Sequence, residues 1–182
     1  MVVNKLATDI YVVKNFVNQD DLVKIVDFAS SLPEPSWYAD NVPAFWYGKQ
    51  YIEHNPKPLE NVNSKIRSLF QSASYIANIQ LQRHLIGHNM TVHRDNIGYI
   101  DGRDDTIAYG VVIYYNDNYS GGEIYYPELD IIYKPDAGDL VLHGSDIPHQ
   151  TTEVIGSVRY FSTSFVFQDK NTPAILDQNI FG

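Results

Sequence analysis

The chain has 182 residues and no cysteine, and its formal net charge is −9 at pH 7. This length is typical of one domain with its own hydrophobic core. The lack of thiols excludes disulfides, thiolate catalysis and cysteine-ligated zinc or iron–sulfur centres, so any metal would need nitrogen and oxygen ligands. The acidic balance disfavours a general contact with nucleic-acid phosphates.

The first residues contain no recognisable targeting signal. Residues 1–10 lack a basic stretch followed by an apolar run, and no segment approaches the length of a membrane span. We therefore expect a soluble cytoplasmic protein without membrane contact. No residue pattern argues for a particular oligomeric state.

The first part of the chain predicts one strand and two helices. Residues 10–16 are expected to form a strand, and the polar cluster that follows caps a helix over residues 20–31. A second helix is expected over residues 59–72. Between them, the proline-rich residues 33–58 contain the aromatic segment Trp37–Tyr47, which is either a loop packed on the core or a substrate lid. The apolar positions of the two helices are Leu22, Ile25, Val26 and Ala29, and Val62, Ile66, Leu69 and Phe70.

After residue 75 the pattern changes to short apolar or alternating runs separated by turn residues. This pattern is typical of an antiparallel sandwich or barrel. The expected strands cover residues 76–86, 106–115, 123–126, 131–133, 139–143 and 158–167. We expect a single domain over residues 1–182, with helical support and loops in 1–75, a β core in about 76–168 and a loosely held polar tail in 169–182.

Three side chains could bind one metal ion. In an extended segment, His93 and Asp95 point to the same side, so they can present an imidazole and a carboxylate together. His149 follows Pro148, which favours an extended backbone before it, and supplies a third donor. Two histidines and one carboxylate leave positions open for a chelating co-substrate and dioxygen, as in the facial triad of non-haem iron(II) oxygenases. Manganese, cobalt, nickel or zinc can occupy the same donors.

A buried cation is expected at the start of the last strand. Arg159 begins an alternation with Phe161, Thr163 and Phe165, which places a guanidinium among aromatic side chains. A charge in such a place needs an anionic partner. The carboxylate of a ligand could be that partner, and the alternative is a salt bridge to an acidic residue of the chain.

With these residues, the sequence resembles the 2-oxoglutarate and iron(II)-dependent oxygenase superfamily, and within it the prolyl 4-hydroxylase-like branch. The resemblance spans most of the chain, from the opening strand and helix to the turns at residues 114–117, 121–123 and 135–139. It implies a mostly β (α+β) fold, the double-stranded β-helix or jelly roll, with supporting helices on one side. It also implies hydroxylation of a C–H bond with release of succinate and carbon dioxide, using Fe(II), 2-oxoglutarate and O2, with ascorbate as a reductant.

The resemblance also implies roles for individual residues. The metal ligands and catalytic residues would be His93, Asp95 and His149. The residues in contact with 2-oxoglutarate would be Arg159, His84, Thr163 and Tyr114.

Two histidines depart from the family pattern. The family often has a tyrosine nine residues before the first ligand, and this chain has His84 there, which either contacts the co-substrate or packs in the core. His143 stands where the family usually has a bulky apolar residue. We expect His143 to be an interior or rim histidine with hydrogen-bond partners of its own, rather than a metal ligand.

The sequence does not identify the substrate. A peptidyl proline or similar residue of a protein is the leading hypothesis, because the resemblance is greatest to that branch. A free amino acid or other small metabolite is the second, and demethylation of nucleic acid is disfavoured by the acidic charge. From another class, the chain could be a catalytically silent jelly roll that binds metal and 2-oxoglutarate, or a cupin-like isomerase. Loop 96–105, with Tyr99 and Arg103, is expected to border the mouth of the barrel.

Overall fold

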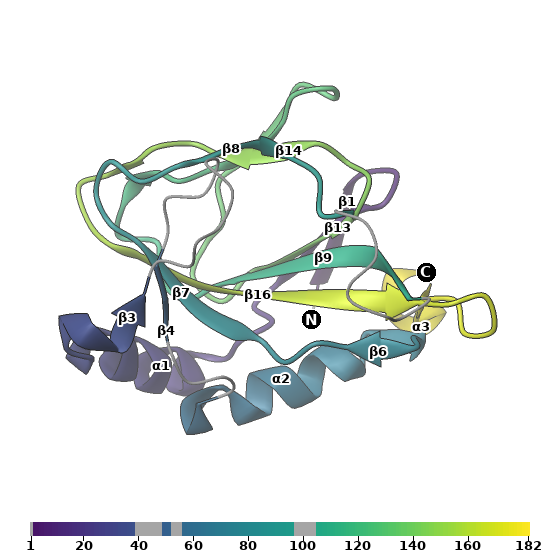
Figure 1. Ribbon diagram of the computed structural model, residues 1–182, viewed down its shortest axis with the longest axis horizontal. Coiled ribbons are helices and arrows are strands. Elements are labelled where there is room, and N and C mark those ends of the chain that lie inside the picture. The colour runs from purple at the N-terminus through teal and green to yellow at the C-terminus, as the bar shows by residue number, and fades with distance from the viewer. Residues whose placement is uncertain (1, 39–48, 52–55, 97–104) are drawn as a thin grey trace.

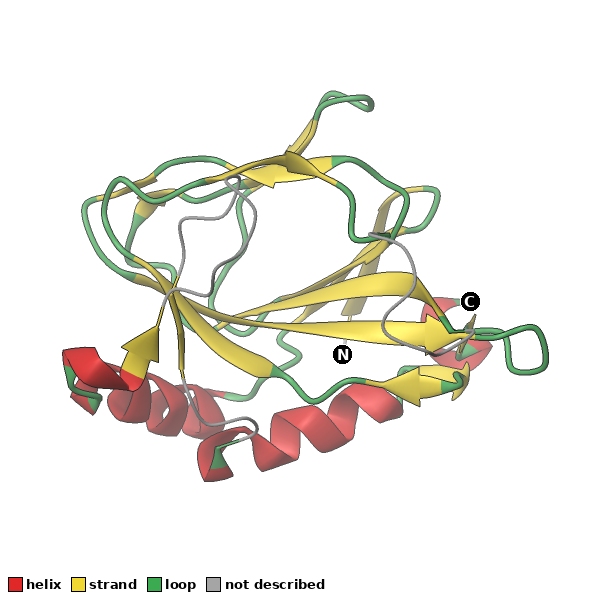
Figure 2. Ribbon diagram, in the orientation of Figure 1, coloured by secondary structure: helices red, strands yellow, loops and turns green. Residues whose placement is uncertain are grey.

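The computed structural model describes residues 2–38, 49–51, 56–96 and 105–182, with residues 38 and 49–51 as backbone alone. The expectations for Phe45, Trp46 and Tyr47, and for Tyr99 and Arg103, fall outside the described residues. Two antiparallel sheets face each other, and helices α1 and α2 cover the outer face of the larger sheet (Figure 1). Figure 2 shows both of these helices on the side opposite the smaller sheet.

The larger sheet has nine strands within the described part of the chain. Their order is β1-β2-β13-β9-β16-β7-β4-β3, and β6 also pairs with β16. The bounds are β1 (Val2–Ala7), β2 (Ile10–Lys14), β13 (Leu140–Gly144), β9 (Thr106–Tyr114), β16 (Arg159–Gln168), β7 (Gln80–His84), β4 (Lys49–Tyr51), β3 (Trp37–Tyr38) and β6 (Tyr75–Ile76).

The smaller sheet has the order β12-β11-β14-β8. Its strands are β12 (Ile131–Tyr133), β11 (Ile124–Tyr126), β14 (His149–Thr151) and β8 (Met90–His93). Two further pairs are β10 (Ser120–Gly121) with β15 (Val154–Ile155), and β5 (Phe70–Ser72) with β17 (Ile175–Leu176).

Both expected helices begin within one residue of their predicted first residues. Helix α1 (Gln19–Ser31) begins after Asn18, whose side chain accepts a hydrogen bond from the backbone N–H of Asp21 at 2.9 Å. The others are the 3-10 turns η1 (Glu34–Ser36) and η2 (Lys57–Leu59), α2 (Glu60–Arg67) and α3 (Gln178–Phe181). Within the described residues, none of these helices has the length and apolar character needed to cross a bilayer.

Both faces of the central strands β2, β13 and β9 are buried, which explains their nearly continuous apolar runs. On β2, Val13 packs toward the helices while Val12 packs between the sheets, and β9 alternates in the same way with Ile113 and Tyr114. Successive side chains of a strand point to opposite faces, so each strand contributes to two cores. The expected metal and co-substrate residues all belong to the space between the sheets or to its rim.

Three expectations about the elements need correction. The helix expected over 59–72 ends at Arg67, because residues 70–72 form β5 and pair with β17. The strand expected over 76–86 is two strands, β6 and β7, that pair separately with β16. The tail is not loose: Leu176 is buried in the helical core, and the ring of Phe181 packs edge-on against Tyr11 at 5.2 Å between centroids.

Candidate metal centre

The structure brings His93, Asp95 and His149 together. Strands β8 and β14 are neighbours, and His149 lies directly opposite His93 in their register. One potential ligand atom from each of the three side chains lies within 4.8 Å of the other two. Short sequence spacing explains the first pair, whereas only the pairing of β8 with β14 brings the third donor to them.

Backbone hydrogen bonds orient both imidazoles in the same way. The Nδ1 of His93 lies 2.8 Å from the carbonyl oxygen of Thr91, and the Nδ1 of His149 lies 2.9 Å from that of Ile147. A carbonyl can only accept, so Nδ1 carries the proton and Nε2 keeps its lone pair. Each Nε2 lies 3.8 Å from Oδ1 of Asp95. Both Nε2 atoms and a carboxylate oxygen therefore lie close enough together to bind one metal ion.

Asp95 is held by its backbone as well as by its side chain. The N–H groups of Asp95 and Asn96 both donate to the carbonyl of Ser145, at 3.0 and 3.1 Å. The second carboxylate oxygen, Oδ2, lies 3.0 Å from Nε2 of His143. Burial alone would raise the pKa of Asp95, but the hydrogen bond from His143 and the nearby imidazoles hold that pKa below its usual value. Asp95 is therefore a carboxylate at neutral pH.

Gly110 on β9 makes room for this carboxylate. A Cβ atom at position 110 would overlap Oδ2 of Asp95 and lie 2.7 Å from Nε2 of His143. We expect Gly110→Ala to displace Asp95, to weaken cobalt(II) binding by about 10–100-fold and to cost roughly 1–3 kcal/mol of stability. A cobalt titration with a urea unfolding curve would measure both. Gly144→Ala is the matched control, since its nearest contact would be an ordinary 3.4 Å, and equal affinities in the two variants would contradict the expectation.

Two buried histidines predict acid sensitivity of the metal-free protein. Burial lowers the pKa of His149 to about 3, helped by nearby His143, and burial with the Arg159 charge lowers the pKa of His84 well below its ordinary value. The unfolded chain binds protons at both rings below about pH 6.5, while the folded chain does not. Stability should thus fall between pH 6.5 and 3, by up to about 1.4 kcal/mol per pH unit for each ring. Urea unfolding at pH 7 and pH 5 would test this, and equal free energies at both would contradict it.

Arg159 opens β16 and is 1% exposed. Its Nη1 donates to Nδ1 of His84, directly opposite on β7, at 3.1 Å. The guanidinium carbon lies 5.0 Å from the ring centroid of Tyr114 and 4.1 Å from that of Phe161. Among the described residues, no carboxylate forms an ion pair with this guanidinium. The described part of the chain thus buries a cation and supplies no carboxylate to pair with it.

Unmatched hydrogen-bond donors gather around this cation. Within the described part of the chain, the buried hydroxyls of Tyr114 and Tyr119, the Nε2 of His84 and the Nε of Arg159 have no hydrogen-bond acceptor. Because Nδ1 of His84 accepts a hydrogen bond, the proton of its neutral ring lies on Nε2, so all four groups can donate. Burial raises the pKa of Tyr114 to about 12, which keeps its hydroxyl protonated. Each unmatched donor costs roughly 1–3 kcal/mol, and the oxygens of a bound carboxylate would satisfy them. We call these four residues the carboxylate cradle.

Gly122 leaves the space that two residues of the carboxylate cradle occupy. A Cβ atom at Gly122 would lie 2.8 Å from the ring of Tyr119 and 3.1 Å from Cδ of Arg159.

Sequence reasoning missed Tyr119, although an aromatic residue within the polar turn 116–122 was a usable signal. Thr163 lies farther along β16, where its hydroxyl accepts a 2.6 Å hydrogen bond from Gln82.

The metal donors and the cradle border the same interior. Tyr114 and Phe161, which contact Arg159, belong to one buried cluster with Tyr126 between the two sheets. Tyr126 in turn lies 3.1 Å from Nδ1 of His143, the neighbour of Asp95. A ligand in this interior could therefore approach the metal donors and the cradle together.

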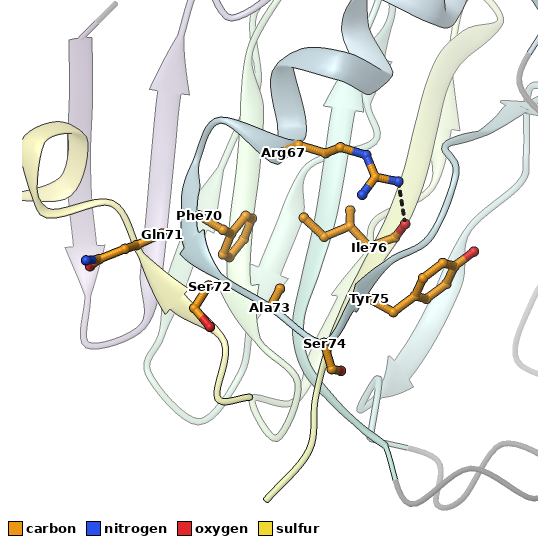
Figure 3. A pocket seen from close by; sticks show the side chains of 8 residues that line it. All are labelled: Arg67, Phe70, Gln71, Ser72, Ala73, Ser74, Tyr75 and Ile76. Atoms are coloured by element: carbon orange, nitrogen blue, oxygen red, sulfur yellow. Dashed lines mark hydrogen bonds between the residues drawn. The ribbon is translucent and has the colours of Figure 1, made fainter. Parts of the chain in front are cut away.

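Two surface hollows lie outside this interior. One, of about 310 Å³, is lined by Arg67 and residues 70–76, and Figure 3 shows its open, mixed lining. Another of about the same volume adjoins Asn96 and Ser145, behind the segment that carries Asp95. Neither lining includes a metal donor or a member of the cradle.

Trp37, the described residue of the expected lid, is buried beneath Arg83, whose guanidinium carbon lies 4.5 Å from its ring.

Comparisons with known proteins identify the fold. No protein-family model matches the chain, and no curated protein matches it by sequence. A Pseudomonas putida prolyl-4-hydroxylase matches with a TM-score of 0.71 at 14% identity, over 88% of this chain and 92% of that one. A prolyl hydroxylase from Trichoplax adhaerens, solved with a hypoxia inducible factor peptide fragment, matches with a TM-score of 0.68 at 18% identity, over 88% of this chain and 84% of that one. HygX from Streptomyces hygroscopicus, solved with nickel, 2-oxoglutarate and hygromycin B, matches with a TM-score of 0.60 at 12% identity, over 89% of this chain and 83% of that one.

At these identities the likeness concerns the fold. The chain has the double-stranded β-helix fold of the 2-oxoglutarate and iron(II) oxygenases, several of which are prolyl hydroxylases. The fold class expected from the sequence, mostly β with supporting helices on one side, is confirmed.

Proposed function

We propose that this chain, which has the fold of the 2-oxoglutarate and iron(II) oxygenases, is a dioxygenase that hydroxylates a C–H bond. His93, Asp95 and His149 would hold the iron, because one potential ligand atom of each side chain lies within 4.8 Å of the other two. The observation that carries the proposal is the combination of this open donor set with a buried cation on the same interior, for which the described residues supply no carboxylate partner. A dicarboxylate can bind the metal at one end and pair with the buried cation at the other.

The chain's own residues would bind and orient the co-substrate. Bound iron(II) would supply the oxidative chemistry by which 2-oxoglutarate, dioxygen and a substrate C–H bond give succinate, carbon dioxide and the hydroxylated product. Arg159 and the other three residues of the cradle would hold the carboxylate that is remote from the metal. The apolar cluster around Phe161 would keep water out of the interior. Ascorbate would serve as an external reductant.

For the substrate, we infer a peptidyl proline or a similar residue of a protein. The fold matches two prolyl hydroxylases over most of their length, and one of these was solved with a peptide. A small metabolite is the second candidate, because the fold also matches HygX, which was solved with hygromycin B. A single succinate-release assay with proline-containing peptides, free amino acids and methylated oligonucleotides would separate these substrate classes.

The activity itself is tested by a stepwise titration. Metal-free protein receives iron(II) and then 2-oxoglutarate without oxygen, and the visible charge-transfer band of the chelate is followed. We expect a band, and then succinate release on adding oxygen and a substrate. A band without succinate over the whole panel would favour the catalytically silent binding module. Bound metal without a band would favour an isomerase or a plain metal-binding module.

A further inference from the structure

His143 connects a metal donor to a tyrosine in the interior. It is fully buried on β13, with Nε2 3.0 Å from Oδ2 of Asp95 and Nδ1 3.1 Å from the hydroxyl of Tyr126. A carboxylate can only accept, so Nε2 of His143 donates to Asp95. Nδ1 is then an acceptor, and the hydroxyl of Tyr126 donates to it. The two hydrogen bonds fix both the ring orientation and the tautomer of His143.

This hydrogen bond makes the two oxygens of Asp95 different. Oδ1 lies 3.8 Å from Nε2 of His93 and equally far from that of His149, whereas Oδ2 is bound by His143. The ring of His143 also packs against that of His149, with 4.0 Å between centroids. One oxygen thus faces the metal position, and the other faces away from it.

The difference matters because a carboxylate can bind a metal through one oxygen or two. If Asp95 binds through one oxygen, it and the two histidines leave three of the six coordination positions of the metal open. With both oxygens, only two positions stay open. A chelating 2-oxo acid needs two positions and dioxygen needs another, so only the one-oxygen mode fits both.

We propose that His143 is a positioning residue that restricts Asp95 to one-oxygen metal binding through Oδ1 and holds that oxygen toward the two imidazoles. The inference rests on the proposed function, since it concerns the same metal site. Tyr126 supports His143 from the other side. Neither side chain needs to contact the metal, and His143 lies outside the set of three donors that face one point.

The test is anaerobic titration of metal-free protein with cobalt(II), followed by its visible spectrum, which needs no turnover. His143→Leu keeps a similar volume but removes the donor, and we expect it to raise the cobalt dissociation constant by about 10–100-fold, as losing an outer-shell partner does. His143→Gln retains an N–H donor and should bind cobalt more tightly than His143→Leu. Tyr126→Phe should weaken binding in the same direction but by less.

Tyr125→Phe is the matched control, because it removes a hydroxyl from the neighbouring, half-buried position of β11. If His143→Leu and the parent bind cobalt equally, the inference is wrong while the proposed metal site stands. If the parent itself binds no cobalt, the proposed function fails, and the inference with it. If His143→Leu does not fold, Tyr126→Phe decides, and affinity equal to that of Tyr125→Phe would overturn the inference.

Discussion

Replacing His149 with alanine is expected to weaken iron(II) or cobalt(II) binding by more than about 100-fold, since loss of an outer-shell partner alone costs about 10–100-fold. His149 is one of three donors around one point, and its Nε2 is freed for metal by the hydrogen bond from Nδ1 to Ile147. Without His149, only Asp95 and His93 remain as metal donors. The charge-transfer band with 2-oxoglutarate and the release of succinate should both disappear.

The control for this variant is Gln150→Ala, at the next position of the same strand. Its side chain is half-buried and takes no part in the metal-donor set. Thermal unfolding of both variants would show whether the fold is intact. A folded His149→Ala protein that binds cobalt like the parent would remove the basis of the proposed metal centre.

Replacing Arg159 with methionine is expected to have opposite effects on ligand binding and on folding. The dissociation constant for 2-oxoglutarate should rise at least about 30-fold, because losing one partner of a buried charged contact costs roughly 2–5 kcal/mol. The free energy of unfolding of the ligand-free protein should stay the same or rise, because a buried charge that has no anionic partner among the described residues is replaced by an apolar side chain. Calorimetric titration of 2-oxoglutarate into the cobalt-loaded protein and urea unfolding would measure the two effects.

Arg83→Met provides the matched comparison. Arg83 is also buried, but it pairs with Glu34 at 2.5 Å and stacks on Trp37. Its loss should lower the free energy of unfolding and leave the affinity for 2-oxoglutarate unchanged. If Arg159→Met instead destabilised the ligand-free fold as Arg83→Met does, and bound 2-oxoglutarate normally, Arg159 would have a structural role alone. Arg159→Lys should recover only part of the affinity, because an ammonium cannot reproduce the planar guanidinium contact.

The sequence alone determined the parts of this protein that depend on local patterns. Short apolar or alternating runs separated by turn residues indicated an antiparallel β fold that includes β9 and β13, and the capping cluster before α1 marked where that helix begins. The spacing of His93 and Asp95 predicted that both donors lie on one side of the chain, although β8 ends at His93 and Asp95 follows it. Arg159 was recognisable because a cation within an aromatic run is costly without a partner.

Tertiary structure decided the features that depend on strands distant in the sequence. Pairing of β8 with β14 placed His149 opposite His93, and pairing of β5 with β17 ended the second helix early. No local pattern reveals that Gly110 leaves space for Asp95, since the two residues lie on different segments. The same holds for the hydrogen bonds of His143, because its neighbours are set by how the two sheets face each other. Side-chain period is a property of a few consecutive residues, whereas register between distant strands is fixed only when the whole core packs.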